Sequence, residues 1–159
     1  MKKLQQKITF VFLIAIAISS IACKKDDPKN DTQNGGNNTE KKGTYTIDGV
    51  VFSGETEIQT FTNDNYSILC VQDDPYSFLQ ITFHSKEEAE KGGTFKVDDE
   101  IINTPSGEVH ITIDGLTYEN DGNFEIKVAN NKITIDNVKL TQTGGGSKKK
   151  IINTASIDF

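Results

Sequence analysis

Hydrophobic and polar residues alternate in short runs over most of the chain after residue 43. Two segments show this most clearly, with apolar residues at every second position: Leu79, Ile81 and Phe83 in 77–84, and Val109, Ile111 and Ile113 in 109–113. A period of two predicts a strand that buries one face. The alternate residues of the two segments, which include His84 and His110, are expected on the outer face. The segment 67–71 is apolar without strong alternation and predicts a more deeply buried strand.

Turn-forming pairs separate these runs. Asp48-Gly49 and Asp114-Gly115 each lie between two apolar segments, and Asp-Gly favours the type I′ turn of a hairpin because both positions need a positive φ. Asn130-Asn131 is expected to form another tight turn. The strands expected around the turns are 44–47, 50–52, 55–62, 67–71, 77–84, 94–97, 109–113, 116–118, 124–128, 132–140 and 151–159.

Two local features interrupt the strand pattern. Ser85 and Glu88 have the spacing of a capping box, and Gly92-Gly93 follows, so we expect a single helical turn at 85–91. Asp136-Asn137 breaks the alternation within 132–140, which predicts a bulge. Roughly ten short strands with turns between them predict an all-β domain, either an antiparallel β-sandwich or a small barrel.

The N-terminal 22 residues have a different pattern. Three lysines precede the apolar segment 8–18. This apolar run is shorter than the roughly 20 residues that span a bilayer, so it predicts a cleaved signal peptide. Residues 20–23, Ser-Ile-Ala-Cys, resemble a lipobox, although Ser20 replaces the usual branched apolar residue. The resemblance implies cleavage before Cys23 and lipidation of that cysteine, which would anchor the chain to a membrane.

The segment 24–42 contains no aromatic or aliphatic side chain. Such a segment cannot repay its ordering entropy, so 23–42 is expected to be a lipidated flexible tether. Residues 24–28, Lys-Lys-Asp-Asp-Pro, resemble the lysine-plus-acidic tag of surface-exported lipoproteins in the Bacteroidota. This implies an outer-membrane protein that faces the cell surface. The remaining 43–159 has the size of one domain.

The domain itself also resembles a known group. Three strand patterns follow in order: Tyr-Thr-Ile-Asp-Gly-Val-Val-Phe-Ser-Gly, Gly-Gly-Thr-Phe-Lys-Val and Gly-Glu-Val-His-Ile-Thr-Ile. This order is similar to that of small all-β lipoproteins of the Bacteroidota. Because these are strand patterns and not chemical signatures, the resemblance implies the fold and no particular activity.

Charge excludes one class of partner. Cleavage before Cys23 removes three lysines and no acidic residue, so the formal charge changes from −6 to −9. The sequence also contains no arginine, the usual bidentate clamp for phosphate. An acidic chain without a basic face repels phosphate backbones. We therefore expect no nucleic-acid partner.

Metal and catalytic chemistry have weak support in the sequence. His84 and His110 could form a zinc site with Glu108 or Glu87 from neighbouring strands, but two outward strand residues are the interpretation we favour. Acidic segments at 73–74, 98–100 and 114–121 suit calcium. However, Glu119-Asn120-Asp121-Gly122 does not fit the twelve-residue calcium loop, because Val128 occupies the position of its closing Glu, and solvated turns are favoured. We expect no metal and no cofactor.

Catalytic motifs of recognisable spacing are missing from the sequence, so we expect a protein that is not an enzyme. Cys70 lies in an apolar run and is expected to be a buried hydrophobe. Tyr66, Tyr76 and Tyr118 fall at strand–loop junctions, where a ring can be partly exposed, and are the candidate ligand-binding residues.

The function expected from these observations is a non-catalytic binding module for a glycan or a protein partner. An accessory subunit of an outer-membrane complex is one alternative. A lipocalin-like carrier of a small apolar ligand is another, and it would need an open barrel interior. The oligomeric state is left open.

The anchor gives the first testable prediction. Cys23→Ser removes the sulfur that would carry the lipid, so the variant is expected to leave the membrane fraction for the soluble fraction. Fractionation of cells that express the variant and the natural sequence measures this. Retention of Cys23→Ser in the membrane pellet would show that another feature anchors the chain.

Overall fold

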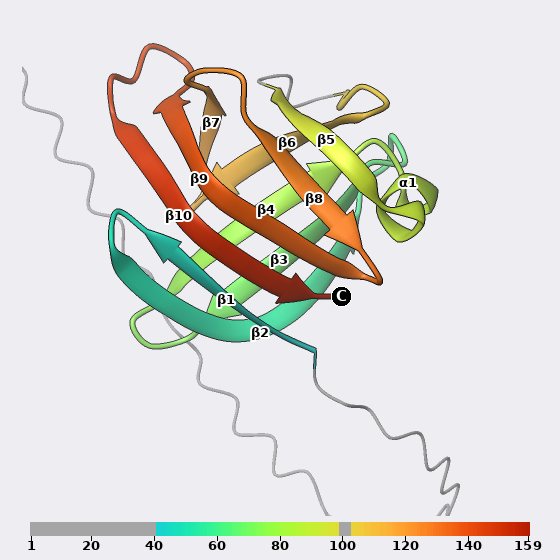
Figure 1. Cartoon of the computed structure of the whole chain (residues 1–159), viewed down its shortest axis with the longest axis horizontal. Coiled ribbons are helices and arrows are strands. Elements are labelled where there is room, and N and C mark those ends of the chain that lie inside the picture. The colour runs from blue at the N-terminus through green and yellow to red at the C-terminus, as the bar shows by residue number, and fades with distance from the viewer. Residues whose placement is uncertain (1–40, 99–102) are drawn as a thin grey trace, which may run out of the picture. The chain divides into compact units, whose positions relative to one another are not determined.

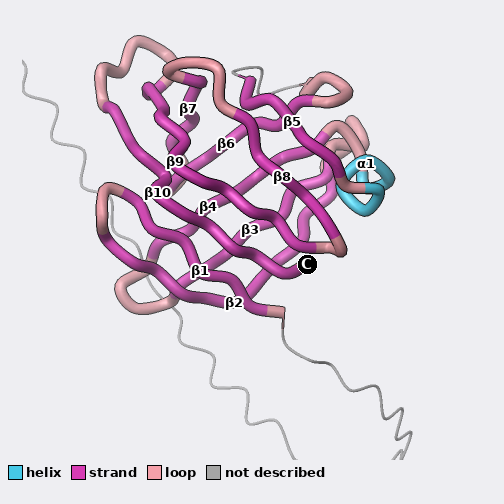
Figure 2. The backbone as a smooth tube through the Cα atoms, in the orientation of Figure 1, coloured by secondary structure: helices cyan, strands magenta, loops and turns pink. Residues whose placement is uncertain are grey.

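A computed structural model describes residues 41–98 and 103–159 of the chain. The predicted signal peptide, Cys23 and nearly all of the predicted tether lie outside these ranges. The described residues form ten strands and one short helix (Figure 1, Figure 2). The elements are β1 (Lys42–Ile47), β2 (Val50–Thr60), β3 (Tyr66–Gln72), β4 (Ser77–Phe83), α1 (Lys86–Lys91), β5 (Gly93–Asp98), β6 (Glu108–Ile113), β7 (Leu116–Asn120), β8 (Glu125–Ala129), β9 (Lys132–Gln142) and β10 (Lys149–Asp158).

The strands close into a barrel. They follow the order β10-β1-β2-β3-β4-β6-β5-β8-β9, and β9 pairs again with β10 to complete the ring. The remaining strand, β7, pairs with both β6 and β9. Figure 1 shows β9 and β10 crossing the barrel in front of β3 and β4. The prediction of an all-β domain with about ten strands is confirmed, in its barrel form.

One pair of neighbouring strands departs from the antiparallel prediction. β5 and β6 are parallel, with Val97 opposite Val109. Parallel neighbours require a connection that returns to the starting end of the first strand. An alternating pattern does not reveal strand direction, so the sequence could not distinguish this crossover from a hairpin.

The predicted turns have the expected backbone. The φ values are 51° and 82° at Asp48-Gly49, 51° and 78° at Asp114-Gly115, and 53° and 55° at Asn130-Asn131. Positive φ at both positions is the requirement of the type I′ hairpin turn. Asn137 also has a positive φ of 49°, and it marks the predicted irregularity in β9.

The single predicted helical turn is also confirmed. The Ser85 hydroxyl accepts a hydrogen bond from the Glu88 amide at 3.3 Å, which caps the first turn of α1. Gly92, with a φ of 71°, ends the helix. Within the described residues, no helix combines the length and apolar character needed to cross a membrane.

The barrel interior is filled with side chains. Leu79, Ile81 and Phe83 of β4 are each 0 % exposed, as their alternation predicted. The interior also holds polar groups: the Tyr45 hydroxyl donates to Ser77 Oγ at 3.0 Å, and burial raises the pKa of Tyr45 to about 12. Cys70 is fully buried in the same core, as predicted, and its burial raises the pKa of the thiol.

Strand β2 is longer than its pattern suggested. The sequence predicted separate strands at 50–52 and 55–62, whereas one strand runs from Val50 to Thr60. Its first half pairs with β1 and its second half with β3, and the change of partner occurs at Gly54 and Glu55. A Cβ at Gly54 would lie 1.8 Å from the carbonyl oxygen of Val71. Glycine therefore marks a bend in a continuous strand, where β2 approaches β3 closely.

This bend gives a prediction about stability. Gly54→Ala places a methyl group against the Val71 carbonyl, so β2 must move away from β3. We expect a loss of roughly 1–3 kcal/mol in the free energy of unfolding, as for other overpacked sites, measured by urea denaturation. The exposed neighbour gives the control, since Ser53→Ala should change stability little. Equal stability of the two variants would contradict the close approach.

The buried thiol gives a second prediction. In the Cys23→Ser variant, Cys70 is the only cysteine. It should resist alkylation by iodoacetamide in the native state, because it is inaccessible and its raised pKa disfavours the reactive thiolate. It should react rapidly in urea. Mass spectrometry measures the labelled fraction, and fast labelling of the native protein would contradict the burial of Cys70.

Candidate functional site

Three polar residues form a buried row on the outer face of the barrel. Ser67 of β3 lies opposite Thr82 of β4, and Thr82 lies opposite His110 of β6. These residues face away from the core, yet they are only 0 %, 4 % and 2 % exposed. His110 points outward as predicted, but the expectation that it faces solvent is wrong. The alternation identifies the face of a strand, and it does not show what covers that face.

Hydrogen bonds fix the side chains of this row. The hydroxyls of Ser67 and Thr82 lie 2.6 Å apart. Gln80, which also faces outward from β4, donates from Nε2 to Ser67 Oγ at 3.1 Å and to Thr82 Oγ1 at 3.2 Å. The amide of Gln80 is thereby held in one orientation, and its Oε1 accepts no hydrogen bond from the described residues.

The turn between β2 and β3 forms a wall beside this row. The Phe61 amide donates to the Asn65 carbonyl at 2.9 Å, and the Asp64 amide donates to the Phe61 carbonyl at 3.0 Å. The side chain of Asn65 is buried, and its Nδ2 donates to Thr104 Oγ1 at 3.4 Å. These contacts hold the turn in a defined shape next to β4.

A pocket of about 300 Å³ lies between the β2–β3 turn and the strands β4 and β6. Its lining combines amide, hydroxyl, imidazole and aromatic groups: Phe61, Thr62, Asn63, Asn65, Gln80, Thr82, His110 and Thr112. The volume is at the lower end of the range for ligand sites. No Asp, Glu or Lys belongs to the described lining, so the chemistry of the pocket suits an uncharged polar ligand.

The sequence did not identify this pocket, because its residues come from three separated segments. The available signal was the pairing of two outward polar positions on β4, Gln80 and Thr82, with two on β6, His110 and Thr112. Recognising that signal requires knowing that β4 and β6 are neighbours. The chain order places α1 and β5 between them.

The three candidate tyrosines do not form one surface. Tyr66 is 4 % exposed and Tyr118 is 1 % exposed, so the expectation of partly exposed rings is wrong for both. Their burial raises the pKa of each hydroxyl. Tyr76, in contrast, is 68 % exposed at the turn between β3 and β4. Its ring meets the Phe78 ring edge to face, with centroids 6.0 Å apart.

The other residues considered for metal binding do not gather into a set of metal ligands within the described ranges. His84 is exposed, and its Nδ1 lies 2.9 Å from the Thr104 carbonyl oxygen. In the described ranges, no group of three or more His, Cys, Asp or Glu side chains is arranged to hold a metal ion. Among the acidic segments, Asp114 Oδ1 accepts from Ser77 Oγ and from the Phe78 amide, both at 2.9 Å.

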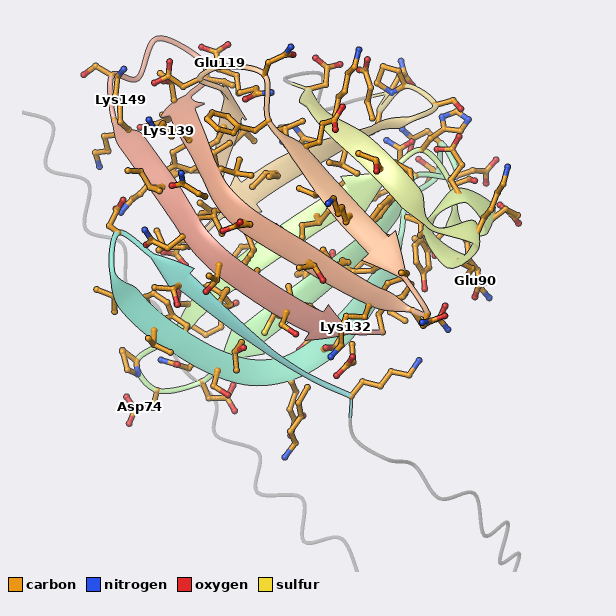
Figure 3. The ribbon with its side chains drawn as sticks, viewed as in Figure 1. Asp74, Glu90, Glu119, Lys132, Lys139 and Lys149 are labelled. Carbon is orange, nitrogen blue, oxygen red and sulfur yellow. The ribbon has the colours of Figure 1, made fainter. Side chains whose placement is uncertain are left out.

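A second cavity, of about 480 Å³, is lined by the residues Ile113, Asp114, Leu116, Tyr118, Lys148, Lys149 and Lys150. Lys149 pairs with Asp121 and Lys150 with Asp48, each at 2.8 Å. Burial opposes ionisation of Asp48, but hydrogen bonds from Lys150 and the Ile151 amide outweigh it and lower the pKa of Asp48. Figure 3 shows Lys149, Lys139 and Glu119 near one another at one end of the barrel. Of the three lysines that line this cavity, Lys149 and Lys150 are thus neutralised by acidic partners in the chain.

Comparisons of the chain with family models, with curated proteins and with solved structures find no match. The function of the chain therefore has to be argued from the chemistry of the pocket and from the N-terminal sequence.

Proposed function

We propose that this chain is a surface-exposed, membrane-anchored lipoprotein whose barrel is a non-catalytic binding module for a neutral glycan. The observation that supports the ligand class is the uncharged lining of the pocket beside β4. The anchor is supported by the sequence before Cys23 and by the polar segment 24–42, which leads into the first strand at Lys42.

The groups in the pocket are those that recognise sugar hydroxyls. A hydroxyl donates and accepts hydrogen bonds, so it pairs well with amides and with other hydroxyls. Gln80 Oε1 is an available acceptor, and the hydroxyls of Thr62 and Thr112 have no hydrogen-bond partner among the described residues. Phe61 is 43 % exposed and offers a ring against which the C–H face of a sugar can pack.

The pre-formed shape of the site strengthens this interpretation. Gln80 and Thr82 form the floor of the pocket, and hydrogen bonds among Ser67, Thr82 and Gln80 fix their side chains. The turn at 61–65 forms the wall, and its own hydrogen bonds fix its shape. Polar groups that are already oriented lose little side-chain entropy when a ligand binds. A weakly bound, highly hydrated sugar needs such a site, because each of its hydroxyls gives up water to enter.

The pocket gives no comparable support to glycoside hydrolysis. His110 is the titratable side chain in the described lining, whereas glycosidases of the usual kind need two carboxyl groups on either side of the bond that breaks. The filled barrel interior also favours an outer-surface binder over the lipocalin-like carrier, which needs internal space. We therefore propose recognition at the outer face without turnover.

Substitutions in the pocket test the proposal. The purified domain would be screened against immobilised neutral glycans, and binding to the best glycan would be measured by calorimetry. Thr112→Val removes a hydroxyl and keeps the shape, and Phe61→Ala removes the ring. Each is expected to weaken binding about tenfold, the equivalent of about 1.4 kcal/mol. Turnover of the glycan should not occur.

A matched control is available on β9. Thr134 is an exposed threonine on the outer face, away from the pocket, so Thr134→Val should bind as the natural sequence does. Absence of binding to every glycan would contradict the proposal. Recovery of the lipoprotein in a stoichiometric complex with an outer-membrane protein would then favour the accessory subunit.

A further inference from the structure

The outer face of β4 continues beyond the pocket. Phe78, Gln80 and Thr82 alternate outward along this strand, and Gln80 and Thr82 line the pocket. Two residues of a strand advance by about 6.7 Å. Phe78, which is partly exposed, therefore follows the pocket directly on the side of the turn between β3 and β4.

Strand β3 supplies apolar neighbours for this continuation. Leu69 lies opposite Gln80, and Val71 lies opposite Phe78. The exposed ring of Tyr76 packs its edge against Phe78, with an angle of 61° between the two ring planes. The ring of Phe78 on β4 and the ring of Tyr76 in the adjoining turn thus follow the polar pocket, and the Tyr76 ring is 68 % exposed.

We propose that the binding site extends along β4 from the pocket to Tyr76 and that its ligand is a neutral oligosaccharide chain. This inference rests on the proposed function and specifies its ligand. Phe78 lies about 6.7 Å along β4 from Gln80, and Tyr76 lies beyond Phe78 in the turn. One sugar ring is too short to contact both ends, whereas a chain of several units can occupy the pocket and stack on Tyr76.

The arrangement of strands favours a glycan over a protein segment. Protein segments commonly bind to a sheet by adding a strand at a free edge. β3 is paired with β2 and β4, and β4 is paired with β3 and β6, so this face offers no edge for main-chain pairing. A ligand here must be held by side-chain hydrogen bonds and ring contacts.

The surrounding charges favour a neutral chain. Glu55 lies opposite Val71 and Glu57 lies opposite Leu69, so two exposed carboxylates of β2 flank the apolar neighbours of the site. Like charges repel, and an acidic polysaccharide would approach these carboxylates. The expected ligand therefore carries neutral sugars at the units that contact β3 and β4.

A length series tests the extended site. The probes are mono- to hexasaccharides of the cello-, xylo-, manno- and malto-oligosaccharide series, titrated into the purified domain by calorimetry. For the series that binds, affinity should rise with length until the chain reaches Tyr76 and then level off. Tyr76→Ala should leave the affinity for the shortest binding sugar unchanged. For the longest oligosaccharide, Tyr76→Ala should weaken binding about tenfold, because a stacked ring is lost.

Two variants separate this inference from the proposed function. Thr112→Val should lower the affinity for short and long sugars alike, because Thr112 lines the pocket. Val51→Ala removes another apolar side chain, on β2, with a similar exposure of 69 %, and should change neither. Thermal unfolding of each variant checks that the fold is retained.

The outcomes differ for the two claims. If sugars bind and Thr112→Val weakens them, but length and Tyr76→Ala have no effect, the extended site is wrong and the pocket stands. If no sugar of any length binds the natural sequence, both claims fail. If Tyr76→Ala instead releases a bound outer-membrane protein from a domain that binds no sugar, the surface recognises protein and the inference is overturned.

Discussion

The pairing of β10 with both β1 and β9 is the interaction on which the other parts of the barrel depend, because it turns an open sheet into a ring. The β1–β2 turn strengthens it. Asp48 donates from its amide to the Ile151 carbonyl and accepts from the Ile151 amide, both at 2.9 Å, and Lys150 contacts the same carboxylate at 2.8 Å. Gly49 donates to Asn153 Oδ1 at 2.8 Å. Closure leaves no long exposed edge among the described strands, and it gives the sheet the curvature around which the outer pocket is arranged.

Inside and outside the ring, burial has different chemical consequences. The interior is filled by aliphatic and aromatic side chains, which contribute stability and leave little room for a guest. On the outer face, Ser67 and Thr82 are buried as polar groups, and their cost is offset by mutual hydrogen bonds and by Gln80. A buried and hydrogen-bonded polar floor is a poor way to gain stability. It is a good way to hold an amide oxygen and nearby hydroxyls at fixed positions for a ligand.

Local chemistry explains which predictions from the sequence succeeded. Three features were predicted correctly because each depends on residues close together in the sequence: the Asp48-Gly49 turn, the Ser85 cap and the inward face of β4. Spatial adjacency explains the failures. The parallel contact of β5 with β6 and the burial of His110 both depend on strands brought together by the ring. The pocket was missed for the same reason. The break predicted between residues 52 and 55 is instead a bend in one continuous strand at Gly54.

The order of the strands has a consequence for the time at which the barrel can form. Asp48 and Ile151, which meet at the seam, are 103 positions apart. The hairpins from β1 to β4 use neighbouring segments and can pair as soon as they emerge from the ribosome. The seam must wait for β10, so the nascent chain remains an open sheet until nearly all of the sequence has been made. For the exported lipoprotein that we propose, late closure would keep the chain unfolded enough to pass through an export channel.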